Sequence, residues 1–336
     1  MTADALRRLP KVQLHCHLEG TLRETTFRTL VRKYGFEGPR ANAARPYGFE
    51  TFGEFLLLFA EICKVLREPD DFARLAGEYV EDALAQGVAY AEIFISPSVW
   101  TYFHRSLDVR AVVRAIRERL DTLGAPAGVR VALICDVTRN FGSDRATETA
   151  RDAIALADLG VIGIGLGGDE AAYPPALFVD AFRVAKEAGL HAVAHAGEAA
   201  GPASVRDALD LLGVERIGHG VRAIEDGALV ARLAAQRIPL EICPTSNRLT
   251  GAVGAGRAHP LAELERRGVV CAIDADDPAL FGATLCEEYA LAEELAGCGA
   301  SLRFARNAVE ASFAEPALKD DLRRRLAAFA AGRHDG

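Results

Sequence analysis

The sequence predicts a (β/α)8 barrel, and three observations favour this fold class. Short apolar runs of strand character alternate with amphipathic helical stretches through most of the 336 residues. This alternation is typical of parallel strands joined by helical crossovers, and eight such strands can be counted along the chain. Histidine and acidic residues follow several of these strands directly, at the strand ends where barrels of this kind carry their active sites. An open doubly wound sheet is the alternative architecture.

The predicted strands share a short length, apolar or β-branched residues and flanking turn residues. They span residues 11–14, 88–96, 129–136, 161–166, 191–195, 216–218, 239–243 and 269–273. Helices are expected over 21–34, from 52 onward, and over 70–86, 107–123, 146–157, 177–188, 202–212 and, at the C-terminus, 317–333. Glycines at the helix ends are predicted C-terminal caps, namely Gly124, Gly160, Gly189, Gly213 and Gly268.

A helical lid is predicted after the first strand, within residues 36–86. Residues 36–51 form a loop rich in Gly, Pro and aromatic residues, and the helical stretch that begins at residue 52 is too apolar for a surface helix. We interpret this stretch as a lid over a pocket, with an ordinary buried helix as the alternative. No repeat or low-complexity segment interrupts the pattern, so residues 1–336 are predicted to form one domain.

The composition excludes several classes of protein. The net charge is −8 and no basic run occurs, so nucleic acid is not an expected partner. No apolar run approaches the length of a membrane span and no signal peptide is seen, so no membrane partner is expected. The seven cysteines form no C-x-x-C pair, which indicates reduced thiols in a cytoplasmic protein.

Histidine and acidic side chains are concentrated at the ends of the predicted strands. His15 and His17 are two apart in a strand, so they share a face and can bind one divalent cation. Gly20 is expected to permit the turn that ends this strand. The residues at the ends of later strands are His195, Glu198, His219, Asp276 and Asp277. Three of the histidines and one aspartate would suit Zn²⁺ with one position left for water, and the remaining acidic and histidine side chains suit proton transfer. The four histidines elsewhere, His259 among them, are assigned no role.

Two negative observations narrow the metal chemistry. Binuclear sites in similar barrels commonly bridge their metals with a lysine from the fourth strand, but residues 165–170 contain none. We therefore expect one catalytic metal. The cysteine-based zinc deaminase signature, H-x-E followed by P-C-x-x-C, is also absent.

Several segments, taken in order, resemble the adenosine deaminase family of metal-dependent amidohydrolase barrels. The first is His15-Cys16-His17-Leu18-Glu19-Gly20, which is similar to the H-x-H-L-[DE]-G opening of that family. The others are the Gly-rich segment 163–170, His195-Ala196-Gly197-Glu198, the segment 216–220, the segment 243–247 and Asp276-Asp277-Pro278. The resemblance covers nearly the whole chain and implies a (β/α)8 barrel that deaminates a 6-aminopurine to a 6-oxopurine and ammonia.

The resemblance also implies a role for each matching residue. One Zn²⁺, or another divalent transition metal, would be held by His15, His17, His195 and Asp276. Glu198 would give a proton to N1 of the purine. His219 and Asp277 would orient the attacking hydroxide, with Asp277 also near N7. The backbone of Gly168 would face N3. Phe55 and Phe59 of the lid would cover the ring.

Glu19 departs from the pattern of adenosine-specific members, which typically have Asp at the position that meets the 5′-hydroxyl. Glu also occurs there in relatives that act on adenine and on 6-amino-6-deoxyfutalosine, a menaquinone precursor. Because the segment 163–170 resembles nucleoside deaminases, a purine nucleoside is the expected substrate, either adenosine or a 5′-modified analogue. The alternatives are adenine, a cyclic amide cleaved by a mononuclear amidohydrolase, and a ligand-binding barrel without activity.

Overall fold

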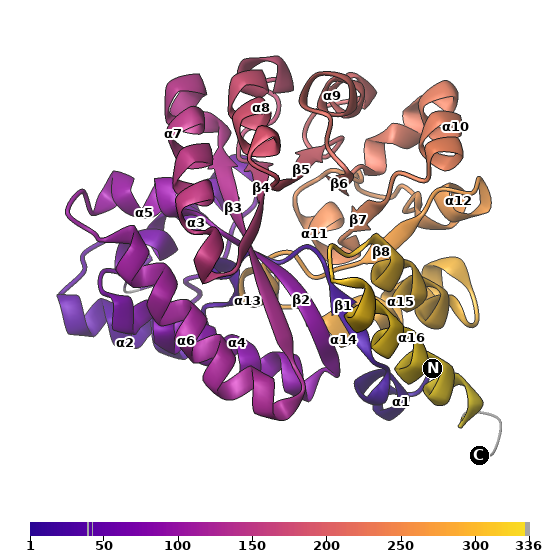
Figure 1. Ribbon diagram of the computed structural model, residues 1–336, viewed down its shortest axis with the longest axis horizontal. Coiled ribbons are helices and arrows are strands. Elements are labelled where there is room, and N and C mark those ends of the chain that lie inside the picture. The colour runs from indigo at the N-terminus through magenta and orange to yellow at the C-terminus, as the bar shows by residue number, and fades with distance from the viewer. Residues whose placement is uncertain (39, 42, 333–336) are drawn as a thin grey trace.

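Eight parallel strands surround the centre of the molecule and confirm the predicted (β/α)8 barrel (Figure 1). The computed structural model describes residues 1–332 except residues 39 and 42. The strands pair in chain order, which is the order of a barrel and excludes the doubly wound alternative. They are β1 Lys11–Gln13, β2 Val88–Ile95, β3 Arg130–Thr138, β4 Val161–Gly167, β5 His191–Ala196, β6 Arg216–His219, β7 Leu240–Ile242 and β8 Cys271–Ile273.

The barrel closes where the residues that follow β8 meet those that follow β1. The backbone N–H of His17 donates to the carbonyl of Asp276 across 3.0 Å, and the N–H of Asp276 donates to the carbonyl of His15 across 3.1 Å. These two bonds bring the ends of the first and last strands together. Residues 259 positions apart in the sequence, His17 and Asp276, therefore become neighbours at this end of the barrel.

The predicted strands lie close to the observed ones because each is an apolar run that the barrel buries. β2, for example, is buried along its whole length. β3 continues two residues beyond the predicted end at Asp136, because Thr138 still pairs with Gly167 of β4. Asp136 consequently lies inside a strand rather than in the loop that follows it.

Helices surround the barrel and connect its strands (Figure 1). Their bounds are α1 Ala3–Arg8, α2 Glu24–Tyr34, α3 Phe52–Val65, α4 Pro69–Ala85, α5 Pro97–Phe103, α6 Val109–Ala127, α7 Gly142–Ala155, α8 Val179–Glu187, α9 Pro202–Asp207, α10 Gly227–Gln236, α11 Pro244–Leu249, α12 Leu261–Arg266, α13 Pro278–Phe281, α14 Leu285–Ala296, α15 Ala300–Ala311 and α16 Pro316–Ala331. α16 is the predicted C-terminal helix, and Arg333, its predicted last residue, lies outside the described residues.

The predicted cap at Gly124 is wrong. α6 continues to Ala127 and ends at Gly128, whose φ of 83° is left-handed. Gly124 is instead buried against the next strand, where a Cβ atom would lie 2.9 Å from the carbonyl oxygen of Val129. A close approach of two backbones, rather than a turn, explains this glycine. The other predicted caps all have positive φ values, at Gly160, Gly189, Gly213 and Gly268.

The predicted insertion consists mainly of α3 and α4, which pack against different parts of the barrel. α4 packs against α6 and β2, so it takes the place of the crossover helix between the first two strands. α3 instead contacts α5 and the short turn of 3-10 helix at Glu19–Thr21. α3 is therefore the part of the insertion that reaches the C-terminal ends of the strands.

Two further observations concern the cysteines and the helices. All seven cysteines are free of disulfide bonds. Among the described residues, no helix combines the length and the apolar character that crossing a lipid bilayer requires.

Candidate active site

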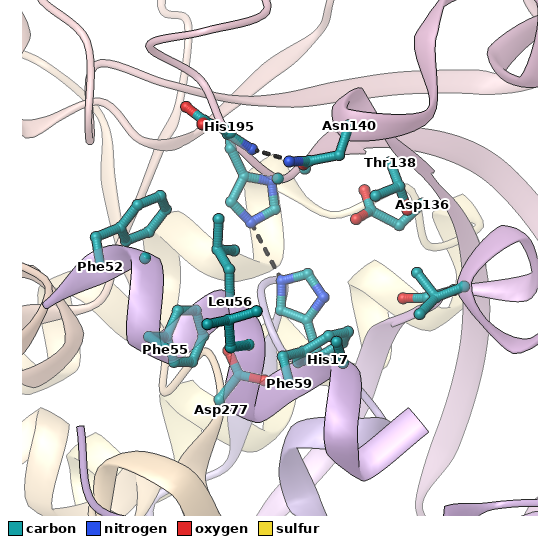
Figure 2. A pocket seen from close by; sticks show the side chains of 18 of the residues that line it. His17, Phe52, Phe55, Leu56, Phe59, Asp136, Thr138, Asn140, His195 and Asp277 are labelled. Atoms are coloured by element: carbon teal, nitrogen blue, oxygen red, sulfur yellow. Dashed lines mark hydrogen bonds between the residues drawn. The ribbon is translucent and has the colours of Figure 1, made fainter. Parts of the chain in front are cut away.

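A cavity of about 440 Å³ opens at the C-terminal ends of the strands (Figure 2). Phe52 and Phe55 of α3 lie on one side of it in this view, and Asp136 and Thr138 of β3 lie on the other. The cavity gathers most of the residues that the sequence singles out. Those lining it are His17, Phe55, Phe59, Gly168, His195, Glu198, His219, Asp276 and Asp277. His15 lies beneath it, fully buried.

The four predicted metal ligands converge at the base of the cavity. The Nε2 atoms of His17 and His195 are 3.1 Å apart, as the dashed line in Figure 2 marks. Oδ1 of Asp276 lies 3.5 Å from Nε2 of His15 and 3.5 Å from Nε2 of His17. Atoms that share one tetrahedral zinc ion, each at about 2.0–2.1 Å, lie about 3.4 Å from one another. The separations in this chain match that value.

Hydrogen bonds at Nδ1 orient two of these imidazoles, those of His15 and His195, with Nε2 toward the shared centre. Nδ1 of His15 pairs with Oε2 of Glu241 at 2.8 Å, and Nδ1 of His195 donates to the carbonyl oxygen of Leu166 at 3.0 Å. Nε2 of His15 is buried and has no hydrogen-bond partner. A buried polar atom without a partner is costly, so Nε2 of His15 is a candidate metal ligand. Metal-binding histidines usually form a hydrogen bond to a carboxylate or carbonyl through their other ring nitrogen, as Nδ1 of His15 and of His195 does. The side chains therefore fit a divalent transition metal.

The charges around His15 favour a cation at the same place. Burial alone would lower the pKa of His15, but its contacts with Asp276 and Glu241 raise that pKa well above its usual value. Burial lowers the pKa of His17 to about 4, so this imidazole stays neutral and keeps a lone pair at pH 7. Ser246 donates to Oδ2 of Asp276 at 2.7 Å, which leaves Oδ1 toward the histidines.

A buried ion-pair network supports His15 from behind. Arg216 donates from Nε to Oε1 of Glu241 at 2.6 Å, and its Nη1 lies 2.7 Å from Oε2 of Glu92. All three side chains are buried. Burial would raise the pKa of Glu241, but Arg216 and His15 lower it. Sequence reasoning missed this network, although charged residues inside apolar strands are a signal that could have found it.

His219 belongs to a second hydrogen-bonded chain. Its Nδ1 lies 3.0 Å from Nδ2 of Asn247, whose Oδ1 is 3.3 Å from Nε2 of His259. The backbone N–H of Leu261 donates to Nδ1 of His259, so Nε2 of His259 carries the proton and donates to Asn247. Asn247 must then donate to His219. This fixes the proton of neutral His219 on Nε2, which is 3.6 Å from Oε2 of Glu198.

Glu198 stands on a loop whose backbone is held by one carboxylate. Glu170 accepts hydrogen bonds from the N–H groups of Gly197, Glu198, Ala199 and Ala200, at 2.6–3.0 Å. Burial, together with the charges of Asp276 and Glu170, raises the pKa of Glu198 to about 8. Glu198 is therefore mostly protonated at pH 7 and can donate a proton.

The structure explains the glycine at position 20 by close packing and not by the turn that the sequence suggested. Its φ is not among the positive values, so the turn does not require glycine there. A Cβ atom at Gly20 would instead overlap the carboxylate of Asp277. The absence of a side chain at this position lets the Asp277 carboxyl enter the cavity. Burial and the neighbouring Asp276 raise the pKa of Asp277 well above its usual value.

Glu19 does not line the cavity. Its Oε1 accepts hydrogen bonds from the backbone N–H of Ser96 at 2.9 Å and from the indole N–H of Trp100 at 2.7 Å. The side chain is fully buried. The indole N–H of Trp100 thus holds one carboxylate oxygen of Glu19, whereas the other, Oε2, is buried and has no hydrogen-bond partner. The predicted contact of Glu19 with a substrate stays a prediction.

The aromatic residues of α3 cover the cavity. The ring of Phe59 meets that of His17 edge-on, with centroids 5.8 Å apart. Phe55 stacks on Phe281 at 5.0 Å. Both residues line the cavity, and their role as a cover over an apolar ring stays a prediction. The charged groups lining the described part of the cavity are all acidic or histidine, with no lysine or arginine among them.

The comparison with known proteins identifies the family. The sequence profile of the family described as adenosine deaminase matches residues 10–329. The chain belongs to the adenosine deaminase family. It is accordingly a hydrolytic deaminase of amidohydrolase type, as the resemblance implied. An adenine deaminase of Rhodospirillum rubrum is 40% identical over 328 residues, which is 96% of this chain and 97% of that protein.

Solved structures with the same fold support this assignment. Adenine deaminase of Arthrobacter aurescens has a TM-score of 0.89 and 32% identity, and the match covers 96% of this chain and 99% of that one. An amidohydrolase of Burkholderia ambifaria with bound zinc has a TM-score of 0.88 and 26% identity, with 99% and 95% covered. The family is metal-dependent. In this chain a buried group made of His15, His195, His219 and Asp276 could hold a metal ion, and His17 belongs to a second such group with Asp276 and Asp277.

Proposed function

We propose that this chain is a metal-dependent hydrolytic deaminase of a 6-aminopurine and that adenine is its substrate. The convergence of His17, His195 and Asp276 beside Glu198 supports the chemistry. The similarity to adenine deaminases supports the free base. The expected preference for a nucleoside receives less support, because relatives of 35–40% identity are named adenine deaminases.

One metal ion would be held by four side chains, those of His15, His17, His195 and Asp276. When bound, a zinc ion lowers the pKa of water from 15.7 to about 7 and so supplies a nucleophile at neutral pH. Fe²⁺ and Mn²⁺ suit the same donor atoms. The Nδ1 contacts of His15 and His195 keep their Nε2 lone pairs directed at the ion.

Glu198 would act as the general acid. Attack of hydroxide at C6 of the purine displaces an electron pair onto N1, and a proton from Glu198 lets N1 accept that pair. The raised pKa of Glu198 provides this proton at pH 7. His219 and Asp277 would orient the nucleophile, Asp277 would also face N7, and the backbone of Gly168 would face N3. Loss of ammonia from C6 then leaves a 6-oxopurine, which is hypoxanthine when adenine reacts.

A nucleoside remains a second candidate because of the size of the cavity. At about 440 Å³ it is within the range that holds drug-sized ligands, and it extends past the catalytic groups to Tyr102, Phe103 and Phe141. A nucleotide is less suited, since no described lining residue is a cation that could bind phosphate.

The decisive experiment measures ammonia release from adenine, adenosine and 6-amino-6-deoxyfutalosine by one preparation whose metal content is determined. Release from adenine with the highest kcat/KM supports the proposal. Release of ammonia only from the two nucleosides would show that the substrate is a nucleoside, the second candidate. No release from any of the three by metal-loaded protein contradicts both.

A further inference from the structure

Asp136 is an acidic residue of the cavity wall for which the catalytic scheme has no use. It lies in β3, and only 5% of it is exposed. Its Oδ1 atom is buried and has no hydrogen-bond partner. The residue lines the cavity on the side opposite Phe52 and Phe55 (Figure 2). A buried carboxyl oxygen without a partner is costly, which indicates a partner that arrives with the ligand.

The neighbouring strand leaves room for this carboxyl. Gly165 is the register partner of Asp136 in β4, and Gly167 is the partner of Thr138. A Cβ atom at Gly165 would lie 2.7 Å from Oδ1 of Asp136, and one at Gly167 would overlap the same carboxylate. Two glycines on one face of β4 thus accommodate a group that faces the cavity.

No ion pair explains Asp136. Arg139 is the nearby cation, but its guanidinium donates to the carbonyl oxygens of Tyr173 at 2.6 Å and His195 at 2.8 Å. The carboxyl of Asp136 receives no hydrogen bond from it. Burial and the charge of Glu19 raise the pKa of Asp136 to about 8. In either protonation state, one oxygen can accept a hydrogen bond.

We propose that Asp136 accepts a hydrogen bond from N9–H of a free purine base and thereby selects bases over N9-substituted purines. This inference rests on the proposed function, in which Glu198 faces N1 and Gly168 faces N3. Glu198 follows β5, Gly168 follows β4 and Asp136 is in β3, so the three occur in strand order around the barrel. The atoms N1, N3 and N9 follow in the same order around the purine.

The depth of Asp136 favours a ring atom over a sugar. Thr138, two residues further along β3, lines the same wall nearer the strand end, and Asn140 lines it beyond that end. A substituent on N9 would remove the N–H donor and push a carbon against the carboxyl. Sites built to bind one hydrogen-bonding group reject analogues that lack it by large factors.

The test compares adenine with 9-methyladenine, which lacks only the N9 donor and adds one methyl group. We expect the wild-type enzyme to prefer adenine by at least about a hundredfold in kcat/KM. Asp136→Ala should reduce this preference to less than about tenfold, and Asp136→Asn, which keeps an acceptor oxygen, should restore part of it. Asp169→Asn, a change of another carboxylate in the cavity wall, is the matched control and should keep the wild-type preference.

Calorimetric binding of hypoxanthine and 9-methylhypoxanthine measures the same discrimination without turnover. Equal binding of the two by wild-type protein, or an unchanged preference in Asp136→Ala, overturns the role of Asp136. Absence of ammonia release from adenine would instead contradict the proposed function, and the binding measurement would still decide the role of Asp136.

Discussion

Asn247 donates a hydrogen bond from Nδ2 to Nδ1 of His219 across 3.0 Å. Because His259 fixes the orientation of the Asn247 amide, this bond sets which nitrogen of His219 carries its proton. The proton lies on Nε2, the nitrogen that faces the cavity. Burial lowers the pKa of His219 to about 3, so the neutral imidazole is the form that acts at pH 7.

Asn247→Asp should therefore impair catalysis without unfolding the protein. A carboxylate would accept a proton from Nδ1 of His219 and leave Nε2 without one. We expect kcat to fall by about a hundredfold or more, as when a catalytic histidine is held in the wrong tautomer. Arg248→Ala, a change of the adjacent residue of α11, serves as the control. A kcat within threefold of wild type, at equal metal content, would contradict the tautomer argument.

Glu198→Gln should abolish deamination and leave metal content unchanged. Glutamine has nearly the same shape but no acidic proton, and we expect a loss of at least about a thousandfold in kcat. The role of Glu198 as an acid also predicts how the kcat/KM of the wild-type enzyme changes with pH. Since the active form is protonated and its pKa is raised to about 8, kcat/KM should fall as the pH rises above about 8. A pH–rate profile that rises between pH 7 and pH 9 would contradict this role.

Gly20→Ala should displace the carboxylate of Asp277, because the new Cβ atom would overlap it. A misplacement of about 1 Å can cost about a hundredfold in rate, and we expect a loss of this order in kcat. Gly254→Ala is a matched control, since its Cβ atom would meet only the side chain of Arg257 at 3.8 Å. Steady-state kinetics with both variants checks the expectation, and equal kcat values would contradict it.

Arg216→Met should destabilise the fold. The change leaves Glu92 and Glu241 buried without their cation, and breaking a buried pair in this way costs about 3–5 kcal/mol. Urea unfolding followed by circular dichroism measures the loss. Arg303→Met, which removes a partly exposed pair with Glu265, should have a much smaller effect. Equal losses in the free energy of unfolding of the two variants would show that burial does not determine how much an ion pair stabilises this fold.

Removal of the metal should abolish activity and leave the barrel folded. The strands and helices bury an extensive apolar core that does not include the ion site. Chelation should therefore leave the far-ultraviolet circular dichroism spectrum unchanged, and added Zn²⁺ should restore turnover. Loss of the helical signal on chelation would show that the ion is needed for folding.

The sequence predicted the barrel and the residues of its cavity because both follow from local patterns. Each strand is a short apolar run, and His17, His195 and Asp276 each lie at or within three residues of the end of a predicted strand. The eight-strand order then brings them together without further information. A strand-end position thus sufficed to place these residues in the cavity.

Other features depend on neighbours that the local pattern does not reveal. The direction of the Glu19 carboxylate depends on Trp100, which reaches it from a different helix. Asp136 faces the cavity because the register of β3 and β4 sets it beside Gly165. His259 influences the site only through its hydrogen bond to Asn247, which the sequence does not reveal. In each case the decisive contact joins segments whose relative position is fixed by packing.

The connection from Glu92 through Arg216 and Glu241 to His15 has a consequence for engineering. Replacing buried charges with hydrocarbon side chains of similar volume is often neutral or stabilising. In this barrel the same replacement would free the imidazole ring of His15 to rotate, because Glu241 is its anchor. A more heat-resistant version obtained in this way would be a slower catalyst, so robustness and reactivity cannot be improved independently at these positions.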